Sequence, residues 1–107
     1  MNIQELTTVM HQFVQAKGWY EADSPRPQTL RNLAVSLSLE ASEVLEHFQW
    51  GETLEEKNAL ADELADVALY LLQIASIAEI NLEHAILNKL EHNYRRTWDL
   101  PRGKKEE

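Results

Sequence analysis

Apolar residues recur every three or four positions along most of the chain, the spacing that places them on one face of an α-helix. Glycine and proline, which interrupt helices, occur only three times each. The sequence therefore predicts an all-α fold, a four-helix bundle-like domain. We expect the helices to cover about residues 3–17, 29–49, 53–80 and 82–97.

Local signals mark the expected helix ends. Gly18 follows the first helix and Gly51 the second, and glycine readily adopts the backbone conformation that ends a helix. Thr53 and Glu56 have the spacing of a capping box, which predicts that the third helix opens there. Asn81 is suited both to end that helix and to cap the fourth. Helices two and three would then form an antiparallel hairpin around Gly51.

The third helix lacks a polar face. Twelve of the fifteen residues from Leu64 to Ala78 are Leu, Ile, Val, Ala or Tyr, and a helix that is apolar nearly all round lies in a core or at a subunit interface. A chain of this size has difficulty covering every side of such a helix, so we predict a homo-oligomer, either a dimer or a tetramer. Burying a large apolar side chain in the interface should stabilise the assembly by about 1.5–3 kcal/mol. The side chains of helices two and three that we expect to need such cover are Val35, Leu39, Leu69, Leu72, Ile74, Ile77 and Ile80.

Two pairs of carboxylates interrupt these apolar helices. Glu40 and Glu43 lie three residues apart in helix two, and Glu63 and Asp66 have the same spacing in helix three. A step of three residues is about 300° of helical rotation, so both members of a pair point the same way. The hairpin would bring the pairs to similar height. Four anions beside a core need neutralisation, and a set of oxygen donors suits Mg²⁺ or Mn²⁺.

Other interpretations of these acids are weaker. A single pair of this spacing is common on solvated helix surfaces. A ferritin-like di-iron site would need Glu-x-x-His, and no histidine here is preceded by Glu at that distance. We therefore expect surface or interface roles for the four histidines, His11, His47, His84 and His92.

Charge and composition narrow the possible partners. The chain has 107 residues, with 18 acidic against 10 basic ones and a formal net charge of −8, which argues against a protein that binds the backbone of a nucleic acid polymer. It has no cysteine and no charge-free apolar run near eighteen residues, so we expect a cytoplasmic protein without a membrane partner. One domain over residues 1–98 and a flexible tail over 99–107 fit this length.

A family resemblance becomes specific where the carboxylates lie. Residues 37–50 read LSLEASEVLEHFQW and residues 62–70 read DELADVALY. These segments closely resemble the MazG-like all-α nucleoside triphosphate pyrophosphohydrolases, in particular the dCTP pyrophosphatase-like branch, which are marked by EXXE followed by EXXD. Further agreement lies in Phe13 with Lys17-Gly-Trp19, in Arg31-Asn-Leu33 and in Asn88-Lys-Leu-Glu-His-Asn93, so that the likeness spans about residues 10 to 96.

The resemblance implies a role for each matching residue. Glu40, Glu43, Glu63 and Asp66 would be the catalytic magnesium ligands, with Mn²⁺ able to substitute. The residues implied to bind the substrate are Trp19 and Trp50 around the base, Arg31 near the phosphates, and Tyr70, Lys89 and Asn93 on the nucleotide. Two departures concern the region before helix two, where Lys17 replaces the usual Arg and Gln28 stands where the family often has His.

The implied activity is Mg²⁺-dependent conversion of a nucleoside triphosphate, ribo or deoxy, to the monophosphate and pyrophosphate, in the service of nucleotide-pool sanitation. One alternative is a non-enzymatic helical oligomerisation or interaction module, which would have no metal dependence. Another is phosphoribosyl-ATP pyrophosphohydrolase, a distant relative within the same superfamily. The preferred base and sugar, the number of metal ions and the carboxylate that activates water stay open at this point.

Overall fold

Four helices make up the part of the chain that the structure, a computed structural model, describes, which is residues 1–97. They are α1 (Ile3–Ala16), α2 (Leu30–Glu46), α3 (Lys57–Ile77) and α4 (Leu82–Arg95). No strand occurs within these residues, so the all-α prediction is confirmed for them. The predicted tail, residues 99–107, lies outside the described range.

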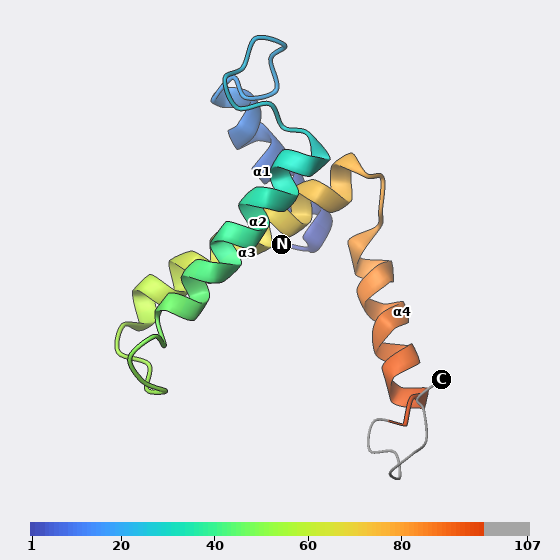
Figure 1. The fold of residues 1–107 in the computed structure, drawn as a ribbon. Helices are drawn as coiled ribbons and strands as arrows, with labels where there is room; N and C mark the ends of the chain where they lie inside the picture. The colour runs from blue at the N-terminus through green and yellow to red at the C-terminus, as the bar shows by residue number, and fades with distance from the viewer. Residues whose placement is uncertain (98–107) are drawn as a thin grey trace.

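The centre of the fold is a hairpin of α2 and α3, which lie side by side and run in opposite directions (Figure 1). The connection 47–56 closes one end of this hairpin, and α1 packs on α3 toward the other end. The core forms at that second end, where Met10 and Val14 of α1 meet Leu72 of α3. The described core is therefore small, and the half of the hairpin near residues 47–56 is covered on fewer sides.

Two of the predicted helix ends agree with the structure. Gly18 ends α1 with a φ of 74°, a left-handed conformation that glycine adopts without steric cost. The side chain of Asn81 caps α4 by accepting a hydrogen bond from the backbone N–H of His84 at 3.0 Å. These two positions fix where the chain leaves α1 and where it enters α4.

The predicted capping box at Thr53 is wrong. Helix α3 begins at Lys57, one turn later, because Glu56 is itself the cap and accepts a hydrogen bond from the N–H of Asn58 at 3.2 Å. A capping box does occur at the start of α1, between Asn2 and Glu5. The expected continuation of α3 to residue 80 also fails, since Glu79 adopts a φ of 59° and turns the chain away.

Helix α4 stands apart from the α2–α3 hairpin (Figure 1) and has no buried residue. The chain accordingly has a radius of gyration of 17.6 Å, whereas a compact domain of this length would have about 13 Å. Within one chain, the helices of the expected four-helix bundle are therefore all present, but the fourth does not close against the others.

The apolar residues that we expected to be buried in a subunit interface differ in how exposed they are in the single chain. Leu72 is only 9% exposed and belongs to the core of the single chain, so it is already covered without a second chain. Others remain open, among them Leu39 at 62% and Ile80 at 52% exposure. Within residues 1–97, no helix has the length and hydrophobicity needed to cross a membrane.

Candidate functional site

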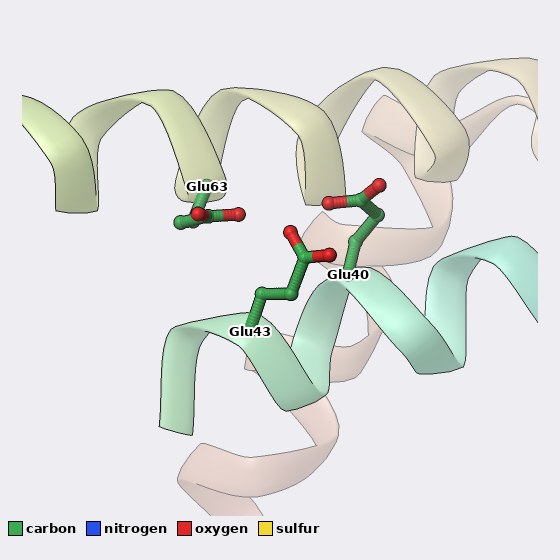
Figure 2. Close-up of side chains that lie close together, drawn as sticks. All are labelled: Glu40, Glu43 and Glu63. Carbon is green, nitrogen blue, oxygen red and sulfur yellow. The ribbon is translucent and has the colours of Figure 1, made fainter. Parts of the chain in front are cut away.

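Three carboxylates meet on the facing sides of α2 and α3. Glu40 and Glu43 project from α2 toward α3, Glu63 projects back from α3, and the carboxylate of Glu43 lies between the other two (Figure 2). One oxygen of each lies within 4.8 Å of those of the others, and all three side chains are half-buried. The antiparallel hairpin produces this cluster because residues on either side of the connection come to the same height.

The cluster is electrostatically unfavourable when it carries no cation. Burial raises the pKa of the Glu40 carboxyl above its ordinary value, and the hydrogen bond and negative charge of Glu43 raise it further. The pKa of Glu63 is raised chiefly by its hydrogen bond with Glu43 and then by burial, while His47 acts in the opposite direction. Within residues 1–97, Oε2 of Glu40 is buried and accepts no hydrogen bond. Protons or a bound cation would neutralise the negative charge of this cluster.

Asp66, the fourth predicted ligand, is exposed and is not part of the group of three. It lies one turn further along α3, and its charge still raises the pKa of Glu40 and of Glu63. Asp66 instead lines a cavity of about 800 Å³ between α1, the 17–29 connection, α2 and α3. A space of this size holds a small-molecule ligand. Of the four predicted ligands, Asp66 is therefore the one that lines the cavity.

Three of the predicted substrate-binding residues, Trp19, Arg31 and Tyr70, line this cavity. The ring of Trp19 is held in place by the edge of Phe13, with 5.6 Å between ring centroids, and by the Arg26 guanidinium at 5.6 Å from the Trp19 centroid. An aromatic surface, a cation and a phenol thus meet beside the acids.

The other three predicted binding residues are not brought to this place within one chain. Trp50 is 92% exposed on the connection between α2 and α3, and it does not line the cavity. Lys89 and Asn93 belong to α4, which stands apart from the α2–α3 hairpin (Figure 1).

Two residues at the site were not predicted. The imidazole Nε2 of His47 lies 3.8 Å from a carboxylate oxygen of Glu63; its position four residues after Glu43 was the available signal, since such residues share a helix face. Gln73, only 3% exposed, lines the cavity. It is one of three residues between Leu64 and Ala78 that are not Leu, Ile, Val, Ala or Tyr, and that isolation was its signal.

The donor set fits a hard divalent cation. All three clustered groups, and Asp66 beside them, offer carboxylate oxygen, which is the ligand type of Mg²⁺ and Mn²⁺. The buried oxygen of Glu40 without a hydrogen-bond partner among the described residues is one that a cation would satisfy. The arrangement can therefore hold a cation next to a ligand in the cavity.

Comparison with known proteins adds the family context. Residues 35–107 match the model of the MazG-like family. The human protein named dCTP pyrophosphatase 1 is 30% identical over 103 residues, which are 88% of this chain and 58% of the relative, so the chain spans little more than half of it. The rat protein of that name is 28% identical, with 94% and 69% covered. A pyrophosphatase structure from Archaeoglobus fulgidus aligns with a TM-score of 0.73 and 36% identity, covering 86% of this chain and 88% of that one.

The raised carboxyl pKa values predict how the stability of the metal-free protein depends on pH. Above the ordinary carboxyl value of 4.5, Glu40 and Glu63 retain protons in the folded chain that they lose in the unfolded one. The contribution of these two groups to stability therefore decreases as pH rises from their ordinary pKa toward their raised pKa in the folded chain. In the presence of a chelator, calorimetry should give a higher melting temperature near pH 5.5 than near pH 7.5.

The difference between variants isolates the cluster from other titrating groups. Glu40→Gln should raise the melting temperature near neutral pH and reduce its pH dependence, because one of the repelling charges is gone. Glu55→Gln, an equal change at an exposed position in the connection, should leave the curve unchanged. A Glu40→Gln protein that melts like the wild type across the range would contradict the repulsion.

Proposed function

We propose, because the chain belongs to the MazG-like family, that it is a Mg²⁺-dependent nucleoside triphosphate pyrophosphohydrolase, which releases a nucleoside monophosphate and pyrophosphate. The observation that carries this proposal is the group of three carboxylates, one helical turn from Asp66, which itself lines a cavity of about 800 Å³. The names of its relatives, dCTP pyrophosphatase and pyrophosphatase, support it. They also make dCTP the first nucleotide to test.

In this proposal the chain's own residues hold and orient the reactants. Glu40, Glu43 and Glu63, with Asp66, hold the cation, and one of these carboxylates orients the attacking water. When bound, Mg²⁺ supplies positive charge that stabilises the oxygens of the phosphoryl group under attack. Arg31, a cation on the cavity wall, is suited to the departing pyrophosphate. Trp19 offers its ring to the base.

The cellular role we infer is removal of unwanted nucleoside triphosphates from the cytoplasmic pool. Two competing assignments predict different behaviour. A helical interaction module would neither consume nucleotides nor depend on a metal. A phosphoribosyl-ATP pyrophosphohydrolase would act on that nucleotide in preference to the ordinary triphosphates.

We also propose that the functional form is a homo-oligomer, a dimer or a tetramer. The single chain leaves α4 apart from the hairpin (Figure 1) and exposes Leu39 and Leu87 at 62% and 56%. Trp50, Lys89 and Asn93 lie away from the cavity of their own chain, so any contact they make with a nucleotide would be in the site of a neighbouring subunit. A second chain would bury the apolar faces and complete the pocket in one step.

The bond that is cleaved tests the proposed reaction. Purified protein with Mg²⁺ should convert dCTP or another nucleoside triphosphate to the monophosphate and pyrophosphate in equal amounts, as chromatography and a pyrophosphate assay measure. Chelation should abolish turnover, and Mn²⁺ should restore part of it. Release of the diphosphate and inorganic phosphate, or no turnover of any nucleotide, would show that the assignment is wrong.

The acids should be required individually. Glu40→Gln, Glu43→Gln, Glu63→Gln and Asp66→Asn should each lower kcat at least about 100-fold, or about 2.7 kcal/mol in the barrier, because each removes a charge that holds the cation. Circular dichroism should show that these variants stay folded. Glu55→Gln is the matched control. Near-normal turnover in two of the four variants would mean that these acids are not the catalytic site.

Light scattering tests the assembly. At micromolar concentration the wild-type protein should have the mass of two or four chains of 12.4 kDa. Leu39→Asp on α2 or Leu87→Asp on α4 should shift it toward the monomer and lower activity, since a charge would be buried in the interface. Gln12→Asp, at an exposed position of α1, should do neither. An active species of one chain's mass would exclude both the interface and the shared pocket.

A further inference from the structure

Gln73 is the one polar or charged residue that is fully buried within residues 1–97, with an exposed fraction of 3%. It lies on α3 and lines the cavity. A carboxamide is costly to bury unless its donors and acceptor find partners. The hydrogen bonds around Gln73 determine which of its atoms is already engaged and which is available to a ligand.

The direction of these bonds is fixed from one end by a backbone carbonyl. Gln28 lies 2.7 Å from the carbonyl oxygen of Arg26, which can only accept, so Gln28 donates with its Nε2. Its Oε1 must then be the atom that faces Gln73, at 2.8 Å. The Gln73 atom in that contact must be a donor, which places the amide nitrogen of Gln73 on the Gln28 side.

The same logic continues through the ring of Tyr20. Gln73 Nε2 donates to the Tyr20 hydroxyl at 3.2 Å, and the same hydroxyl is hydrogen-bonded to His11 Nδ1 at 2.6 Å. The other nitrogen of His11, Nε2, is hydrogen-bonded to Ser76 Oγ at 2.7 Å. Both amide hydrogens of Gln73 are thereby used, and what Gln73 can offer a ligand is its carbonyl oxygen, an acceptor.

The position of Gln73 relative to the acids gives this acceptor a direction. Asp66, Tyr70 and Gln73 follow one another at steps of four and three residues, so they share one face of α3, and all three line the cavity. Gln73 lies about 10 Å along the helix from Asp66. A nucleotide whose phosphates lay near the carboxylates could therefore extend its base toward Gln73, since this span is comparable to the length of a nucleoside monophosphate.

We propose that the carbonyl oxygen of Gln73 accepts a hydrogen bond from an exocyclic amino group of the base, and so selects cytosine over uracil nucleotides. This inference rests on the proposed function for the placement of the phosphates. In a pyrimidine nucleotide the substituent at C4 lies across the ring from the nitrogen that bears the sugar. It is therefore the group that advances furthest into the cavity, as an amino donor in cytosine and a carbonyl acceptor in uracil.

A uracil carbonyl at this place would leave two acceptors facing each other away from water. Neither the base nor Gln73 could rotate out of this conflict without cost, because Gln28 and Tyr20 hold the amide group from its other side. Sites that offer a fixed hydrogen-bond partner discriminate strongly against a ligand that lacks the matching group. Gln73 and Gln28 are the specificity-determining and the positioning residue, respectively.

Binding of a matched nucleotide pair tests the inference without relying on turnover. The α,β-imido analogues of dCTP and dUTP differ in the base only at C4 and its neighbouring ring nitrogen, and calorimetry in the presence of Mg²⁺ measures both dissociation constants. The wild-type protein should bind the dCTP analogue at least about tenfold more tightly. Gln73→Met, which keeps the length of the side chain but removes the acceptor, should bring the two constants within about twofold, chiefly by weakening the dCTP analogue.

Two further variants and a separate readout sharpen the test. Gln28→Met should reduce the preference partially, because Gln73 loses one of its supports but keeps its oxygen. Gln12→Met, the same change at an exposed position of α1, should leave it intact. Equal binding of both analogues by the wild-type protein, or an unchanged preference in Gln73→Met, would overturn the role of Gln73. Absence of dCTP hydrolysis alongside a Gln73-dependent preference would instead overturn the proposed reaction and leave the acceptor standing.

Discussion

The antiparallel packing of α2 against α3 is the constraint on which the rest of the site depends. It brings Glu40, Glu43 and Glu63 together although their charges repel, so the apolar contacts along the hairpin must supply the free energy that holds the acids in place. The raised pKa values of Glu40 and Glu63 are a consequence of the burial and mutual repulsion of these carboxylates. A cation bound between these carboxylates would offset their repulsion without requiring them to move together first.

A second constraint lies at the other end of the cavity. The polar chain from Gln28 through Gln73 and Tyr20 to His11 ties the 17–29 connection to α1 and α3. Because this connection carries Trp19, the network also positions an aromatic ring on the cavity wall. The wall of the cavity thus includes Asp66 and the hydrogen-bonded amide groups of Gln28 and Gln73.

The single chain leaves both its apolar surface and its predicted nucleotide pocket incomplete. Few residues are buried within residues 1–97, and α4 stands apart from the hairpin (Figure 1). Large apolar side chains such as Leu39 and Leu87 are exposed. Three residues that the family resemblance associates with the nucleotide lie on the connection 47–56 (Trp50) and on α4 (Lys89 and Asn93). In the oligomer we propose, folding and completion of the pocket would be one process, since the contacts that stabilise the chain would also supply the missing residues.

The sequence by itself was enough to predict four helices and two carboxylate pairs on their facing sides. Helical periodicity and the spacing of Glu40, Glu43, Glu63 and Asp66 are local properties of the chain. The sequence did not determine the helix boundaries as well. Thr53 and Glu56 could each cap the start of α3, and the folded backbone shows that Glu56 does so. Only the tertiary structure decided that Asp66 lines the cavity, that α4 stands apart from the hairpin and that the amide nitrogen of Gln73 is hydrogen-bonded to Gln28 and Tyr20. These features depend on contacts between residues distant in sequence, which no local pattern encodes.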